Sequence, residues 1–177
     1  MILTYGHGTD SAERTVATLR GATVACIVDI RIAPGSRRNP QFARDELDRW
    51  LPEAGISYRW DKRLGGFRKP GPDNPDVAWR EEMFRGYAEH MRSESFLSAI
   101  AGVLDEAASA QVAVMCSESL WWRCHRRLVA DFLLAARGVP VAHLMHNNRI
   151  EEHRPSSGLR LRDDGLLVYD GGQGTLL

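Results

Sequence analysis

Apolar positions along the chain form short runs that alternate with segments of helical spacing. Several runs are almost continuously apolar and rich in β-branched residues, which is typical of parallel strands buried on both faces. Five runs predict strands, at residues 2–5, 23–30, 56–60, 112–116 and 139–145. The intervening segments predict helices from a cap at 9–11 to Gly21, from Phe42 to about Gly55, and at about 77–92, 94–108 and 122–137.

This alternation predicts the α/β class, as a three-layer domain with a mostly parallel sheet of about five strands and helices on both faces. The length of 177 residues suits one domain and no linker divides the chain, so a single domain is expected over residues 1–177. The tail at 147–177 is polar at first and then predicts a hairpin around Asp163-Asp164-Gly165.

Composition narrows the class of protein. With 44% hydrophobic and 26% charged residues, a packed core is expected rather than disorder. No apolar run reaches the roughly 18 residues of a membrane span, and no leader pattern follows Met1, so a cytoplasmic protein without a membrane partner is expected. The three cysteines then predict reduced thiols rather than a disulfide framework, and Cys26 lies in an apolar run that predicts an inert core position.

Charge is balanced over the whole chain but uneven along it. The formal net charge is +0, which gives no global argument for nucleic-acid binding. Residues 31–70 carry ten Lys or Arg against five Asp or Glu, whereas residues 71–110 carry three against eight. The asymmetry is compatible with a local positive field and equally with solvated arginines paired to helical acids.

Polar residues gather where the predicted strands end. Ligands of a parallel sheet bind beyond the carboxyl ends of its strands. His7, Asp29, Arg31, Gly65 and Cys116 each follow or close a predicted strand, so a pocket is expected at this edge.

The chain resembles the family called domain of unknown function 488, on several motifs in matching order from residue 2 to about 145. These motifs are Thr4-Tyr5-Gly6-His7-Gly8, Val28-Asp29-Ile30-Arg31, Arg38-Asn39-Pro40-Gln41-Phe42, Gly55-Ile56-Ser57-Tyr58, Leu64-Gly65-Gly66, Phe84-Arg85-Gly86-Tyr87-Ala88, Met115-Cys116-Ser117-Glu118 and Trp122-Arg123-Cys124-His125-Arg126. Departures from the usual family residues occur at Tyr5, Gly8, Ser117 and Trp121. The resemblance implies a family-like core at 1–146 with an extension at 147–177, and it implies no particular activity.

Cys116 is the first candidate for chemistry at this edge. It closes a predicted strand just before a loop and a helix, where the helix dipole and Arg123, Arg126 and Arg127 would favour a thiolate nucleophile. The alternative is a buried strand cysteine. His7, Asp29 and Glu118 complete the catalytic candidates, as groups able to carry protons.

A metal site is another hypothesis, with Cys116, Cys124 and His125 as the main candidate ligands and Glu118 and His7 as further ones. Seven residues separate the two cysteines, which is not the spacing of a zinc-ribbon pair. The sequence therefore commits to no metal and leaves the cofactor open.

An anion site is the third hypothesis, because arginines near the start of a helix bind phosphate together with free backbone N–H groups. The candidate binding residues are Arg31, Ser36, Arg38, Gly65, Trp122, Arg123, His125 and Arg126. The alternative is surface ion pairing. Trp60, Trp79, Trp121, Trp122 and Tyr87 could stack on a nucleobase or simply fill the core.

Together these features favour an enzyme that acts on an anionic, nucleotide-like or nucleic-acid substrate at the carboxyl edge of the sheet. A non-enzymatic nucleic-acid or regulatory binding module, using the basic 31–70 face, and a metal-binding protein are the alternatives. The sequence leaves the reaction type, the substrate and the oligomeric state open.

Overall fold

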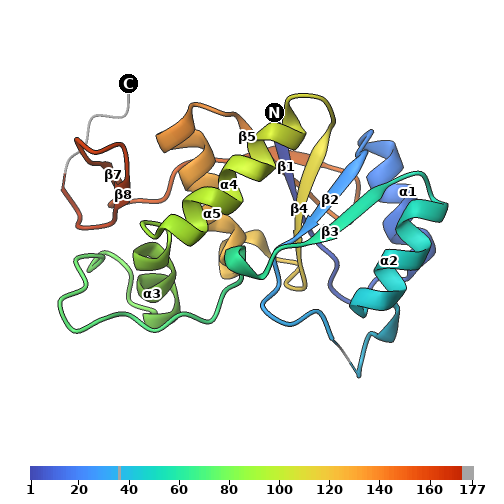
Figure 1. The fold of residues 1–177 in the computed structure, drawn as a ribbon, viewed down its shortest axis with the longest axis horizontal. Coiled ribbons are helices and arrows are strands. Elements are labelled where there is room, and N and C mark those ends of the chain that lie inside the picture. The colour runs from blue at the N-terminus through green and yellow to red at the C-terminus, as the bar shows by residue number, and fades with distance from the viewer. Residues whose placement is uncertain (36, 173–177) are drawn as a thin grey trace.

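The computed structural model describes residues 1–35 and 37–172 and contains a six-stranded sheet in the order β3-β2-β4-β1-β5-β6 (Figure 1). Five strands run parallel and the sixth is antiparallel to β5. The strands are β1 (Ile2–Gly6), β2 (Cys26–Asp29), β3 (Ser57–Trp60), β4 (Val112–Cys116), β5 (Val141–Leu144) and β6 (Ile150–Glu152). This architecture confirms the prediction of a mostly parallel α/β sheet.

Helices cover both faces of the sheet, which makes three layers. One face carries α1 (Ala12–Gly21) and α2 (Arg44–Glu53). The other carries α4 (Glu94–Ala107) and α5 (Arg126–Asp131), with α3 (Glu82–His90) beside α5 (Figure 1). None of the helices in the described residues combines the length and apolar character needed to cross a membrane.

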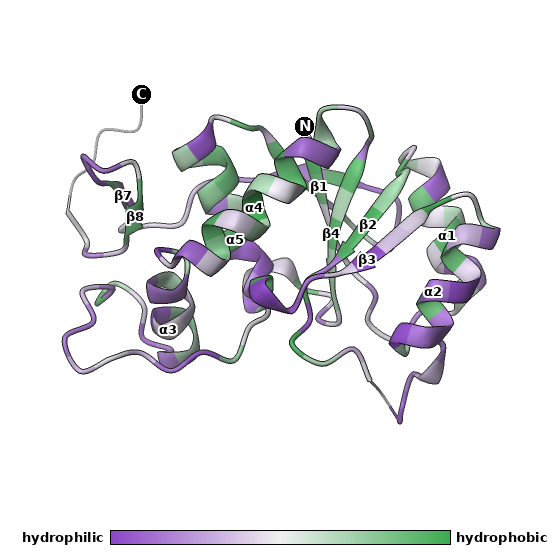
Figure 2. Ribbon diagram, viewed as in Figure 1, coloured by the Kyte–Doolittle hydropathy of each residue, from purple (hydrophilic) through white to green (hydrophobic). Residues whose placement is uncertain are grey.

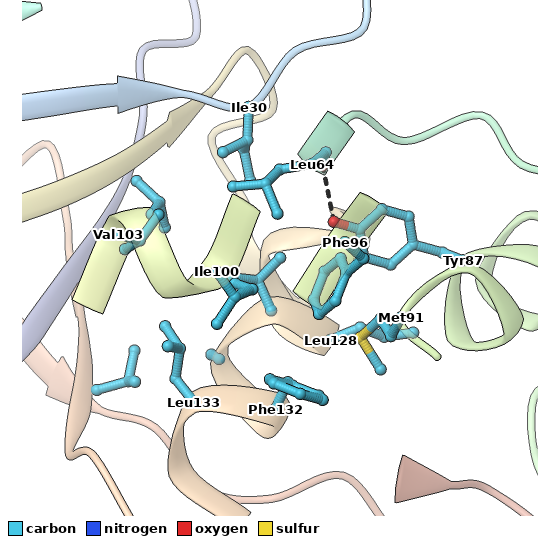
Figure 3. Close-up of a cluster of buried hydrophobic side chains, with 14 of the residues drawn as sticks. Ile30, Leu64, Tyr87, Met91, Phe96, Ile100, Val103, Leu128, Phe132 and Leu133 are labelled. Carbon is cyan, nitrogen blue, oxygen red and sulfur yellow. Dashed lines mark hydrogen bonds between the residues drawn. The ribbon is translucent and has the colours of Figure 1, made fainter. Parts of the chain in front are cut away.

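Two apolar cores lie between these layers, one on each face of the sheet. Figure 2 shows mostly apolar central strands, flanked by helices that carry both polar and apolar residues. The core under α4 and α5 includes Phe96, Ile100 and Phe132, all of them at most 1% exposed (Figure 3). Tyr87 joins this core and donates a 2.7 Å hydrogen bond to the carbonyl of Leu64 (Figure 3). That bond ties α3 to the loop after β3, at the edge where a pocket was predicted.

The predicted helix at 122–137 is broken in the structure. A 3-10 turn, η3 (Trp121–Arg123), is followed by Cys124 in an extended conformation, with φ −121° and ψ 150°. Helix α5 starts only after His125, and a π-helical turn, η4 (Phe132–Ala136), continues it. Helical periodicity does not reveal this break, because the residues on both sides of it keep helical spacing.

The carboxyl-terminal region partly follows the prediction. The expected hairpin is present as β7 (Arg160–Leu161) and β8 (Leu167–Val168). Strand β6 was not predicted, because Ile150, Glu151 and Glu152 carry too little apolar character for a buried strand. Two further 3-10 turns are η1 (Pro40–Phe42) and η2 (Lys62–Leu64).

Candidate functional site

A cavity of about 340 Å³ lies at the carboxyl ends of β2 and β4. Its walls come from residues 31–33, 66–67, Met83, 116–118 and 123–125. Strands β2 and β4 are neighbours, but β2 leads to α2 on one face and β4 leads to α5 on the other. A parallel sheet opens a crevice where adjacent connections leave in opposite directions, so the fold itself creates this hollow.

Two cysteines and a histidine meet on one side of the cavity. The ligating atoms of Cys116, Cys124 and His125 all lie within 4.8 Å of one another, and all three residues are buried. Cys116 closes β4, whereas Cys124 and His125 occupy the break between η3 and α5. The break in the predicted helix therefore brings the second sulfur to the first.

Backbone contacts fix the orientation of His125. Its Nε2 lies 3.0 Å from the carbonyl of Ile30, and only a protonated nitrogen can donate to that oxygen. The other nitrogen, Nδ1, is then unprotonated and lies 3.6 Å from the sulfur of Cys124. Burial lowers the pKa of His125, which keeps the ring neutral.

Gly66 leaves the space beside this ring. A Cβ atom at this position would lie 2.9 Å from Nδ1 of His125, closer than real Cβ contacts. The absence of a side chain at Gly66 therefore keeps the unprotonated nitrogen of His125 accessible from the cavity.

The two thiols have opposite protonation tendencies. Burial raises the pKa of Cys124, but a hydrogen bond from Cys116 and the positive charge of Arg126 outweigh burial and lower it to about 6. The same hydrogen bond, together with burial, raises the pKa of Cys116 well above its usual range. The proton of the pair therefore stays on Cys116, and Cys124 carries the thiolate.

Two atoms of this group have the separation expected at a tetrahedral metal site. Zinc binds thiolate sulfur at about 2.3 Å and imidazole nitrogen at about 2.0–2.1 Å, which places S and N about 3.6 Å apart at tetrahedral angles. The sulfur of Cys124 and Nδ1 of His125 are separated by 3.6 Å. A protonated Nε2 that donates to a carbonyl is also the usual arrangement of a metal-binding histidine. Three protein ligands beside a cavity leave a fourth position for water or substrate.

The residues of this site lie in a part of the chain that matches a known protein family. The family described as Domain of unknown function DUF488 matches residues 11–133, more than half of the chain. The chain belongs to this DUF488 family. No curated protein matches the chain, and neither does any solved structure.

Every residue that lines the cavity lies inside the DUF488 match. Glu118 is one of them; it is exposed, and its Oε1 accepts a 3.0 Å hydrogen bond from the backbone of Leu120. Arg123 is another exposed residue of the wall. The cavity therefore combines the buried sulfur and nitrogen atoms with one carboxylate and one accessible guanidinium.

A second polar cluster lies beside the cavity and is bonded internally. Asp29 is fully buried, binds the guanidinium of Arg31 at 2.5 Å and accepts a 2.8 Å bond from Tyr58. Arg31 also donates 2.9 Å to the carbonyl of Phe42 and 3.3 Å to Nε2 of His7. Arg31 lines the cavity, but these contacts hold its charge on Asp29.

His7 lies before the DUF488 match and outside the cavity wall. Its Nδ1 donates 2.9 Å to the carbonyl of Gly8, and its ring stacks on Phe42 with centroids 3.9 Å apart. Burial and the charge of Arg31 lower its pKa to about 3. Both ring nitrogens are therefore occupied within the fold.

The remaining predicted site residues are dispersed. Gly65 packs against the backbone of Ile32 at the cavity edge, whereas Arg38 and Trp122 are exposed and not part of its wall. Arg126 is buried behind the thiols, at 1% exposure. The predicted anion ligand Ser36 lies outside the described residues.

Most of the predicted stacking residues lie elsewhere. Trp79 and Tyr87 pack in the core, Trp121 stacks on His143, and Nε1 of Trp60 donates to the backbone of Arg31.

Sequence reasoning missed several apolar residues of the wall. Ile32, Phe67 and Met83 line the cavity, and Phe67 is 81% exposed with a φ of 59°, unusual for a side chain of this size. The signal that could have found Phe67 was the long loop after β3, since such loops are commonly functional.

Proposed function

We propose that this DUF488 protein is a metal-dependent enzyme whose active site is the cavity beyond β2 and β4, with Cys116, Cys124 and His125 as the metal ligands. The observation that carries the proposal is the convergence of three ligating atoms within 4.8 Å at the wall of an open cavity. Structural zinc sites usually close their shell with a fourth protein ligand, whereas catalytic sites leave one position open. A divalent metal such as zinc suits this donor set, because thiolate and imidazole are its preferred ligands.

The contacts around the three ligands support this assignment. The sulfur of Cys124 and Nδ1 of His125 both offer lone pairs at 3.6 Å, an arrangement that a cation between them stabilises. The carbonyl of Ile30 holds His125 in the tautomer that a metal requires. Gly66 provides the space on the cavity side of this ring.

The remaining wall residues suggest hydrolysis of a small anionic substrate. A cavity of about 340 Å³ has the size of small-molecule sites. Arg123 can pair with an anionic group of the substrate, and Ile32 and Met83 offer an apolar surface. A metal held there would supply Lewis-acid chemistry that makes water more acidic. Glu118 would be the carboxylate of the wall that takes a proton from the attacking water and gives a proton to the leaving group of the hydrolysed bond.

Metal content of the full-length protein tests the proposal. Protein purified without chelators and reconstituted with zinc under reducing conditions should hold about one equivalent, and cobalt should give the absorption band of a thiolate complex. Cys124→Ser should lose this metal, whereas Cys26→Ser should keep it because Cys26 lies at the other end of β2. Failure of the reduced wild-type protein to bind zinc or cobalt would overturn the proposal, as would equal loss in both variants.

Gly66→Ala provides a variant that leaves every ligand in place. Its methyl group would lie against Nδ1 of His125, so zinc affinity should fall at least tenfold, within the range of second-layer effects on metal sites. Gly21→Ala is the matched control, since a Cβ there meets no atom within 4 Å. Unchanged affinity in Gly66→Ala would place the metal away from Nδ1.

A further inference from the structure

Arg126 is a buried cation that has no carboxylate next to it. It is the largest of the fully buried side chains, at 1% exposure. Its guanidinium donates 3.3 Å to Thr4 Oγ1, 3.4 Å to the carbonyl of Ser119, and to the carbonyl of Glu118. Among residues 1–35 and 37–172 it takes part in no ion pair with a carboxylate. A buried charge normally needs a compensating partner, and the Cys124 thiolate, whose pKa this charge lowers, is one such anion. What holds the guanidinium at Thr4 and the two carbonyls still requires an explanation.

A continuous chain of buried hydrogen bonds leads from Arg126 to a carboxylate. Thr4 Oγ1 lies 2.7 Å from Nδ1 of His143, and Nε2 of His143 lies 3.0 Å from Nδ1 of His153. Nε2 of His153 lies 2.8 Å from Oδ1 of Asp131. All five side chains are at most 6% exposed, so no solvent interrupts the chain.

The chemistry of the two ends gives every bond in this chain one direction. A carboxylate only accepts, so Asp131 requires the proton on Nε2 of His153, and in a neutral imidazole Nδ1 of His153 is then an acceptor. His143 must then donate from Nε2 and accept at Nδ1 from the hydroxyl of Thr4. The oxygen of Thr4 in turn accepts from Arg126, which only donates. Aligned hydrogen bonds polarise one another, so the negative and positive ends stabilise each other through the neutral groups.

His143 is held in this neutral arrangement. Burial, with further contributions from the neighbouring His153 and Arg126, lowers the pKa of His143 to about 3. The ring of Trp121 stacks on His143 with centroids 3.9 Å apart and an interplanar angle of 6°. The stacking fixes the ring plane, so both nitrogens of His143 stay aimed at their partners.

We propose that the hydrogen-bond relay from Asp131 through His153, His143 and Thr4 holds the buried guanidinium of Arg126 in place, and that this relay makes Arg126 the positioning residue for the loop after β4. The guanidinium of Arg126 holds the carbonyls of Glu118 and Ser119, and Glu118 lines the cavity. The relay links that loop to β1, β5 and the residue after β6. Thr4, His143 and His153 lie outside the DUF488 match, so flanking parts of the chain support the site.

Histidine tautomers in the wild-type protein give a direct test. Long-range ¹H–¹⁵N NMR spectra distinguish Nδ1–H from Nε2–H in each imidazole. Between pH 6.5 and 8, both His143 and His153 should be in the neutral Nε2–H form, as the direction of the relay requires. An Nδ1–H tautomer or a charged ring at either residue would overturn the relay.

Substitution of Thr4 tests whether the relay positions Arg126. Thr4→Val removes the hydroxyl while keeping the shape, and Thr4→Ser keeps the hydroxyl. Hydrogen exchange of the Arg126 guanidinium protons should be about tenfold faster in Thr4→Val and close to wild type in Thr4→Ser. Thr18→Val is the control: Thr18 is also buried but lies on α1, so its substitution should leave this exchange unchanged. Equal exchange rates in wild type and Thr4→Val would overturn the positioning role.

Measuring zinc affinity tests whether the relay affects the cavity. Only this experiment rests on the proposed function. Thr4→Val should weaken zinc binding roughly 10–100-fold, as loss of supporting contacts does at metal sites, and Thr4→Ser should restore most of it. If the wild-type protein binds no zinc, the proposed function fails while the tautomers and the Arg126 exchange still decide the relay. If zinc binds and Thr4→Val binds it equally well, Arg126 does not position the site.

Discussion

At the scale of single residues, the contacts around a side chain decide whether its chemistry is available. His7 and Asp29 both have the chemistry of an acid or a base. In the fold, His7 donates to the carbonyl of Gly8 and accepts from Arg31, and Asp29 is bonded to Arg31 and Tyr58. These bonds occupy the polar atoms of both residues beside the cavity, whereas Glu118 places a carboxylate at its wall.

The free energy of unfolding should fall at acid pH because His143 is neutral in the folded protein. Its folded pKa of about 3 lies below the unfolded value of about 6.5. Between these values the unfolded chain binds the extra proton, so the stabilising contribution is complete above pH 6.5 and is lost as the pH falls toward 3. From pH 7.5 to 5, this residue should cost about 2 kcal/mol of unfolding free energy.

Denaturant unfolding at pH 7.5 and pH 5 measures this effect. The groups that surround His143 are Thr4, Trp121, His153 and the charge of Arg126. The wild-type protein should lose about 2 kcal/mol more on acidification than His143→Gln, in which the titrating group is absent. The same loss in both proteins would contradict the prediction.

At the scale of elements, two helical glycines have different surroundings. Gly102 in α4 has only the end of the Arg59 side chain near the position of a Cβ, at 3.6 Å. Gly86 in α3 approaches the backbone carbonyl of Arg68 so closely that a Cβ would overlap it. Gly86 thus allows α3 to pack against the loop that carries Phe67, a residue of the cavity wall.

Alanine at these two positions should change stability in opposite directions. Gly102→Ala should raise the unfolding free energy by about 0.5–1 kcal/mol, because alanine is the better helix former. Gly86→Ala should lower it by about 1–3 kcal/mol, because the backbone of Arg68 must move. Urea unfolding of both variants checks the pair, and stabilisation in both would show that the α3 contact is not tight.

At the scale of the whole molecule, the carboxyl-terminal region is tied to α5 through one buried carboxylate. Asp131 accepts hydrogen bonds from His153, from the backbone of Ser156 and from the hydroxyl of Tyr169 at 2.8 Å. Tyr169 is fully buried and also contacts Trp79 in the core. The described residues after β5, up to residue 172, are therefore part of the packed structure, although they lie beyond the family match.

Tyr169→Phe tests this connection. Removing the hydroxyl takes one partner from a buried carboxylate, so the unfolding free energy should fall by about 1.5–3 kcal/mol. Tyr5→Phe is a matched control, because the hydroxyl of Tyr5 makes only 3.4 Å contacts with Asp10 and Thr15, and its loss should cost less than about 1 kcal/mol. Equal effects in thermal or denaturant unfolding would contradict a special role for the Asp131 contact.

Local patterns predicted the elements of the core closely. The apolar run at 112–116 is strand β4 over the same residues, and Asp163-Asp164-Gly165 lies in the turn between β7 and β8. Strand β2 is shorter than the predicted run at 23–30, because Thr23 adopts a turn conformation with φ 55°. The predicted edge of the sheet does hold the cavity, since that position depends only on the direction of parallel strands.

The amino-acid sequence by itself determined the alternation of strands and helices, the edge where a cavity forms, and the cysteines and histidine available there. These properties depend on local spacing and on residue type. The tertiary structure alone decided that Cys124 leaves the helical path to meet Cys116, and that His7 and Asp29 are both bonded to Arg31. It also decided that Arg126 is linked to Asp131 by hydrogen bonds through three intervening side chains. The two bonds of Thr4, with His143 and with Arg126, join residues more than a hundred positions apart, and only the packed chain brings them within hydrogen-bond distance.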